Sequence, residues 1–210
     1  GKPNSAAPTS MGGAIYMFAS TVTPDDVVIT GSAANAGAGI RAGDTQLVVS
    51  RSSIVGNDAA GRGGAIDSEE ALGNHPMSLI IDDSLIAGND ADYGGGIFAS
   101  DSSVQVERST ISGNTAGTYG AGGLTEAGTA SIESSTISGN DSAVGGGGWA
   151  FGISSTGSRL VNSTVAGNVA LYAGGVMTTA QLAGQIGIVN SIVADNGEDE
   201  LLAVGDDPAF

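Results

Sequence analysis

The sequence contains no cysteine, one lysine (Lys2) and one histidine (His75) among its 210 residues. Without cysteine the chain has no disulfide bond and no thiolate metal site, which is common in exported bacterial proteins. Only six residues are basic against 22 acidic ones, so the formal net charge is −16. Nucleic acid is excluded as a partner because neutralising phosphates requires clustered cations, and anionic membranes are excluded for the same reason.

Long hydrophobic runs are also missing, since no apolar stretch approaches the roughly 18 residues that a membrane span needs. We therefore expect no membrane insertion. Apolar residues make up 40% of the chain and many of them are alanine, so any core would be thin. Repeat folds tolerate a thin core because neighbouring units share the burial.

What the sequence does contain is a repeat. The pattern Ser-x-[Ile/Leu/Val]-x-Gly-Asn recurs at intervals of 25 to 32 residues, and its copies end at Asn57, Asn89, Asn114, Asn140, Asn168 and, with Asp195 in place of glycine, at Asn196. A glycine-rich signature alternates with it and closes on Ile15, Ile40, Ile66, Ile97, Leu124, Trp149 and Val176. Two interleaved signals with one period predict a repeat architecture.

Each unit holds three short segments with strand character: the Ser-x-Ile segment, a segment starting at the glycine-rich signature, and an alternating segment such as residues 47–49. Three strands per unit fit one turn of a parallel β-solenoid, whereas propeller blades need about 40 residues. We predict an all-β fold, a single parallel β-helix of about seven three-strand coils over residues 11–196. Residues 1–10 would form an extended N-terminal arm, and residues 197–210 an acidic C-terminal tail.

The repeated residues have structural explanations. Alternation places the aliphatic residue three positions before each asparagine, and the serine five positions before it, on the inward face. The preceding glycine suits a tight corner, and each asparagine can bond to the asparagine one coil away. We expect the six asparagines that close the copies to form a structural ladder rather than a ligand site.

The copies STISGN at 109–114 and 135–140, NSTVAGN at 162–168 and the GGAI and GGGI strings resemble a known group. They are similar to the repeats of bacterial right-handed parallel β-helix surface proteins, including autotransporter-like adhesins and polymorphic outer-membrane proteins. The resemblance implies a right-handed coil, a secreted or cell-surface location, and a role in adhesion, matrix or an appendage.

The alternative function is binding or cleavage of a cell-surface or matrix polysaccharide, because enzymes of the pectate-lyase-like fold act on such substrates. The His-Gly and Arg-Ile-Lys strings of its hydrolases are absent. Asp83 and Arg108 both stand six residues before an asparagine and form the runner-up enzyme site, with Arg51 in the same column. A cross-coil ion pair is the simpler expectation, because hydrolysis needs two carboxylates on one face and consecutive residues such as Asp82 and Asp83 project oppositely.

The longest coil, between Ile66 and Ile97, offers a second place for function. Extra residues in a solenoid emerge as a loop, and such loops often bind ligands. The candidate binding loop therefore consists of Asp67, Glu69, Glu70 and His75. We expect no cofactor; Ca²⁺ is the alternative, although the segment lacks the alternating spacing of a calcium loop.

A β-solenoid also has two open edges with unpaired backbone groups, which soluble examples normally cover with caps. The sequence shows no amphipathic helix at either end of the repeat. We therefore expect subunits to stack into a homo-oligomer or filament. The predicted function is that of a non-enzymatic extracellular structural or adhesive protein.

Overall fold

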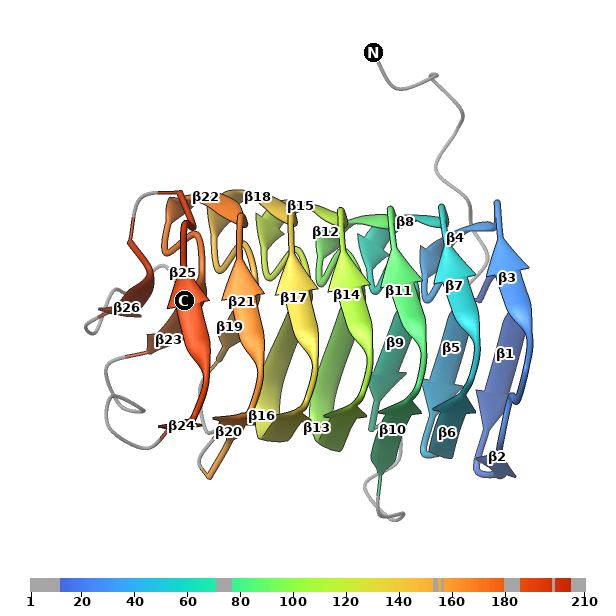
Figure 1. Ribbon diagram of the computed structural model, residues 1–210. Helices are drawn as coiled ribbons and strands as arrows, with labels where there is room; N and C mark the ends of the chain where they lie inside the picture. The colour runs from blue at the N-terminus through green and yellow to red at the C-terminus, as the bar shows by residue number, and fades with distance from the viewer. Residues whose placement is uncertain are drawn as a thin grey trace.

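The computed structural model describes residues 12–70, 77–152, 155, 157–179, 186–197 and 199–204. These residues form 26 strands and no helix, arranged in three parallel sheets that we call A, B and C. The chain passes through A, B and C once in each turn, and successive turns lie side by side along one axis (Figure 1). This confirms the predicted parallel β-solenoid of about seven turns.

Sheet B is the most regular of the three and faces the viewer in Figure 1. It contains the Ser-x-Ile segments, and its seven strands are β3 (Val28–Thr30), β7 (Ser53–Val55), β11 (Leu85–Ala87), β14 (Thr110–Ser112), β17 (Thr136–Ser138), β21 (Thr164–Ala166) and β25 (Ile192–Ala194). The residue three before each asparagine points inward, and Ile54, Ile86, Ile111, Ile137 and Val165 are fully buried in register.

Sheet A contains both remaining segments predicted from the sequence. Its leading strands start at the glycine-rich signature: β1 (Ile15–Phe18), β5 (Ile40–Gly43), β9 (Ile66–Glu69), β13 (Ile97–Glu107), β16 (Gly123–Glu133), β19 (Trp149–Phe151), β23 (Val176–Thr179) and β26 (Leu201–Val204). Its trailing strands hold the alternating segment: β2 (Thr21–Val22), β6 (Gln46–Ser50), β10 (Ser78–Asp82), β20 (Arg159–Val161) and β24 (Gly187–Val189). In β13 and β16 the two segments are one continuous strand of 11 residues.

Sheet C follows each asparagine and was not predicted. Its strands are β4 (Ala33–Ala36), β8 (Asp58–Arg62), β12 (Asp90–Tyr93), β15 (Thr115–Tyr119), β18 (Asp141–Gly145) and β22 (Val169–Tyr172). Most of these segments are built from alanine, glycine and aspartate, which are poor strand formers, so pattern analysis misses them. Small inward residues such as Ala59, Ala91 and Ala116 fill this side of the solenoid.

One register prediction is wrong. Gly123, rather than Leu124, lies in line with Ile97 and Trp149 inside the solenoid. A Cβ atom at Gly123 would lie 2.5 Å from the Trp149 ring, so only glycine leaves room for the buried indole. Leu124 instead pairs with Phe98 on the outer face of sheet A, where both side chains pack in a second apolar cluster.

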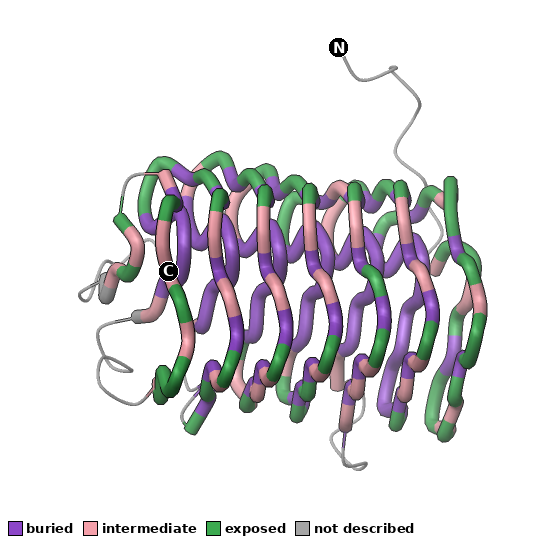
Figure 2. The backbone as a smooth tube through the Cα atoms, in the orientation of Figure 1, coloured by how far each residue is buried: buried purple, intermediate pink, exposed green. Residues whose placement is uncertain are grey.

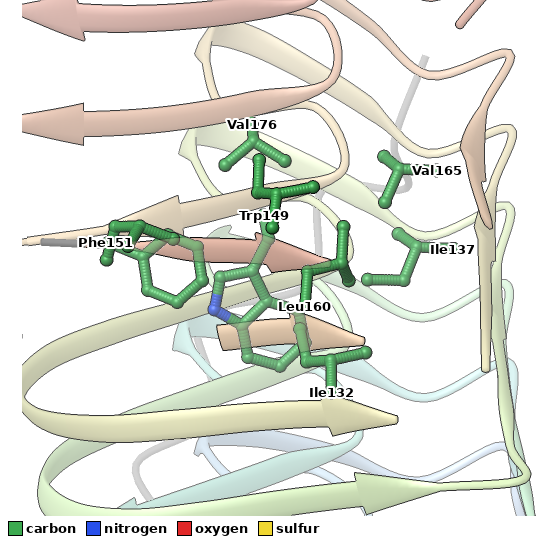
Figure 3. A pocket seen from close by; sticks show the side chains of 9 residues that line it. Ile132, Ile137, Trp149, Phe151, Leu160, Val165 and Val176 are labelled. Carbon is green, nitrogen blue, oxygen red and sulfur yellow. The ribbon is translucent and has the colours of Figure 1, made fainter. Parts of the chain in front are cut away.

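The solenoid interior is apolar along its whole length, and buried residues recur in successive turns (Figure 2). Towards the C-terminal end Trp149, Phe151 and their neighbours enclose a void of about 10 Å³ (Figure 3). Its lining side chains are those of Ile132, Ile137, Trp149, Phe151, Leu160, Val165, Val176, Ile186 and Ile188. An apolar void of this size holds no ligand, since even one water molecule needs polar partners.

The predicted arm at 1–10 lies outside the described residues. Beyond the predicted boundary at 196, β26 pairs in register with β23, so sheet A continues by one further rung.

Candidate functional sites

The asparagines form one continuous hydrogen-bonded column at the corner between sheets B and C. At Asn89, the side-chain Oδ1 accepts from the backbone N (3.0 Å) and Nδ2 (3.0 Å) of Asn57. Its Nδ2 donates to Asn114 Oδ1 (2.9 Å) and to the carbonyl oxygen of Ile54 (3.0 Å). The same bonds link successive rungs to Asn168 and Asn196. Every inner amide is thus satisfied within the protein, as a buried polar column requires.

The residue before each asparagine turns the corner in the left-handed conformation. The glycines of the five regular copies have φ between 61° and 66°. In the degenerate copy Asp195 adopts φ 57°, a conformation that aspartate tolerates better than most residues. The substitution therefore preserves the corner.

A second column, made of serines, closes the corner between sheets A and B. Ser84 Oγ accepts the backbone N–H of Ser52 (3.1 Å) and donates to the carbonyl oxygen of Asp82 (2.7 Å). Corresponding bonds are made by Ser52, Ser109, Ser135, Ser163 and Ser191. Both recurring polar residues of the repeat therefore serve backbone hydrogen bonding.

A partly buried ionic cluster on the outer face of sheet A is formed by Arg41, Asp67 and Glu69 together with Arg62 from β8 of sheet C. Arg41 on β5 and Asp67 on β9 lie in register and form an ion pair, and the Asp67 side chain is 0% exposed. Glu69 accepts hydrogen bonds from Arg41 and from Arg62, with 2.9 Å between Arg62 Nη1 and Glu69 Oε1. The Arg62 guanidinium also lies 4.8 Å from the centre of the Phe98 ring.

Burial outweighs the neighbouring charges at Asp67 but not at Glu69. It raises the pKa of Asp67 to about 6, although Arg41 and Arg62 act in the opposite direction. Asp67 Oδ2 lies against Arg41 Nη1, but this contact does not offset the cost of burying the carboxylate. Burial opposes ionisation of Glu69 too, but the hydrogen bonds from Arg62 and Arg41 keep its pKa below the usual value.

The structure changes the interpretation of the candidate binding loop. Asp67 and Glu69 lie in strand β9, paired with arginines, and Glu70 follows the end of that strand. His75 lies outside the described residues. Sequence analysis missed Arg41, although Arg41 and Asp67 each follow the isoleucine of their glycine-rich signature, which places opposite charges in adjacent turns.

The runner-up enzyme site is an exposed ionic corner. Arg108 Nε lies 3.2 Å from Asp83 Oδ1, Arg108 Nη1 lies 3.1 Å from Glu107 Oε2, and Asp82 is a third partner. The expectation that Asp82 and Asp83 project oppositely is wrong, because Asp83 turns the corner with φ 47° and strand alternation ends there. Arg51 forms its ion pair with Asp25.

The stack of turns has an exposed edge at each end. We call β1 to β4 the N-terminal edge and β22, β24, β25 and β26 the C-terminal edge, because within the described ranges no further strand pairs beyond them. None of these eight strands contains a charged residue. Val28 is 73% exposed at one edge, and Ile192 and Leu201 are 60% and 53% exposed at the other.

Within the described part of the chain, no three histidine or acidic side chains converge in a way that could hold a metal ion. The same residues include no helix long and apolar enough to cross a membrane. None of the family models, curated proteins and solved structures compared with the chain matches it.

Proposed function

We propose that this protein is a non-enzymatic extracellular structural or adhesive β-solenoid whose subunits associate end to end into an oligomer or filament. The observation that carries the proposal is the composition of the edges. Natural sheets protect exposed edges with charged residues, proline or short strands. Here the eight edge strands are short, at two to four residues each, but none carries a charge, whereas nine of the 18 inner strands do, such as β5 with Arg41 and β13 with Glu107.

In an end-to-end contact, the last turn of one copy would pair with the first turn of the next, as successive turns already pair within the chain. Four edge strands would gain backbone hydrogen bonds to the neighbouring copy, and inward-facing side chains left open at the C-terminal edge would be covered. Leu201 and Ile188 are two such side chains, since they continue the core columns of Val176 and Leu160 and are both exposed. Burying apolar surface of this kind favours association.

The extracellular and non-enzymatic parts of the proposal have separate support. A net charge of −16 and the similarity to repeats of bacterial surface proteins favour a secreted or cell-surface location. The recurring serines and asparagines are used in backbone bonding, and Asp83 and Arg108 are engaged in an exposed ion pair. The chemically distinctive residues thus have structural roles.

Polysaccharide binding or cleavage is the second candidate, and one observation favours it on the outer face of sheet A. Burial raises the pKa of Glu126, and Tyr119, which packs against the apolar cluster containing Leu124, has its ring centre 6.4 Å from that of Tyr93. Incubation with acidic and neutral polysaccharides, followed by assay of reducing ends, tests this candidate. Activity that is lost in Glu126→Gln would replace the structural proposal by an enzymatic one.

The test of end-to-end association is light scattering over a wide concentration range with three variants. Val28, Thr136 and Ile192 occupy the same outward column of sheet B, at the N-terminal edge, the centre and the C-terminal edge. We expect the wild type to associate, Val28→Lys and Ile192→Lys to stay monomeric, and Thr136→Lys to behave as wild type. A wild type that is monomeric at every concentration overturns the proposal.

A further inference from the structure

The asparagine column has two different ends. At the N-terminal edge Ser32 stands in the asparagine position, and its backbone N donates to Asn57 Oδ1 (3.0 Å) as the backbone of every inner rung does to the next. The first rung is therefore present in the backbone, but it carries a short hydroxyl side chain instead of an amide.

At the C-terminal edge a carboxylate terminates the column. In each inner rung, Nδ2 donates to the Oδ1 of the following asparagine at 2.8 to 3.0 Å. Asn196 has no following asparagine, and its Nδ2 donates to Glu200 Oε2 at 2.6 Å. The backbone of Glu200 is held in place because its carbonyl oxygen accepts from Val176 N (2.9 Å). Glu200 thus supplies the oxygen that a further rung would supply.

We propose that Glu200 is a removable cap on the asparagine column and limits end-to-end association, and that Ser32 of the next copy takes its place below Asn196 in the assembly. This inference rests on the proposed end-to-end contact. A hydrogen bond to a carboxylate is stronger than one between neutral groups, so the free edge is stabilised by the cap. A second copy must displace the carboxylate or bury it, and burying an unpaired charge is costly.

Glu200 also places a charge at an edge whose strands carry none. Natural proteins guard open edges with a charge that points towards the incoming strand. The C-terminal edge strands lack such a residue, and Glu200 lies directly before β26 with its carboxylate on the last rung of the column. One side chain therefore serves both as a hydrogen-bond cap and as a guard.

The experiment compares the concentration for half-maximal association of the full chain with that of Glu200→Gln, Glu200→Ala and Glu107→Gln. Glu107→Gln removes the same charge from the exposed corner near Arg108, away from both edges. We expect both Glu200 variants to associate at a roughly tenfold lower concentration than the wild type. Glu107→Gln should match the wild type.

A second arm tests the role of Ser32. Ser32→Asn restores the amide of a regular rung, and we expect it to lower the association concentration further in the Glu200→Gln background. If the wild type associates but the Glu200 variants do not differ from it, or if Ser32→Asn weakens association, the cap is overturned while the end-to-end contact stands. If the wild type stays monomeric at every concentration, the end-to-end contact itself is overturned.

Discussion

The inner turns and the terminal turns of this solenoid are built from the same repeat but differ in how completely it is satisfied. An inner rung such as Asn114 has hydrogen-bond partners above and below, and Ile111 beside it is fully buried. At the C-terminal edge Asn196 relies on Glu200, and Ile192 and Leu201 are exposed. A repeat therefore specifies its own interior well, while the ends need special residues or a partner.

Removing one inner rung of the asparagine column should cause the largest loss of stability. Asn114→Ala leaves the backbone N–H and one amide hydrogen of Asn89 without partners in a buried corner, and it removes the side-chain bond to the carbonyl oxygen of Ile86. We expect a loss of about 3–5 kcal/mol in the free energy of unfolding, measured by urea denaturation. Asn196→Ala removes the same acceptor from Asn168, but we expect a smaller loss of about 1–2 kcal/mol, because the vacated position lies at the edge, where a water molecule can enter and accept these bonds. Equal losses at the two positions would contradict the comparison.

The ionic cluster lies among the inner turns but outside the repeated asparagine and serine columns, and we expect it to make stability depend on pH. The folded pKa of Asp67 is about 6 against an ordinary value of 3.8. Between these values the folded state holds a proton that the unfolded state has lost, so this contribution to stability is complete below pH 3.8 and is lost as the pH rises through 6. The difference is about 3 kcal/mol.

Asp67→Asn isolates that contribution, because asparagine resembles the protonated acid. We expect the variant and the wild type to be similarly stable near pH 4, and the variant to be the more stable one near pH 7. Denaturation curves at several pH values provide the measurement. A wild type that is more stable than Asp67→Asn at pH 7 would show that the ion pair with Arg41 outweighs desolvation.

A change in the packing inside the solenoid should cause a loss of stability of intermediate size. Gly123→Ala places a methyl group where the Trp149 ring lies, and we expect a loss of about 2 kcal/mol from the resulting strain. The double variant Gly123→Ile with Trp149→Val restores the side-chain types of neighbouring turns, and it should recover most of the stability. Thermal unfolding followed by circular dichroism distinguishes the two, and a double variant no better than Gly123→Ala argues against the fit.

The exposed corner at Arg108 should matter least. Its side chain is about half exposed, and ion pairs in such positions contribute little to stability. We expect Arg108→Ala to change the free energy of unfolding less than any substitution above, and the change to vanish in high salt. A loss as large as that of Asn114→Ala would mean that the corner, rather than the asparagine column, sets the register of the turns.

The sequence predicts the parts of the fold in which the same residue returns in each turn. Sheet B and the inward positions of Ile54, Ile86 and Ile111 follow from strand alternation and the repeat alone. Sheet C does not, since alanine, glycine and aspartate carry little strand signal, and the shift at Gly123 depends on the volume of Trp149 one turn away.

The candidate sites, like the fold, could be predicted from the sequence only in part. The pairing of Asp83 with Arg108 follows from column counting, whereas the contact of Asp82 with the same arginine depends on a left-handed corner residue that strand alternation ignores. Asp67 was expected in a loop and lies in β9, because its neighbours Arg41 and Arg62 neutralise it on the face of the sheet. Edge composition can be read from the sequence only when the edge strands are known.

Small-angle X-ray scattering at increasing concentration tests the central claim most directly. If subunits stack through their edges, the maximum dimension of the particle rises with concentration while the radius of gyration of its cross-section stays constant. A maximum dimension that does not change, or a cross-section that grows with it, contradicts end-to-end association.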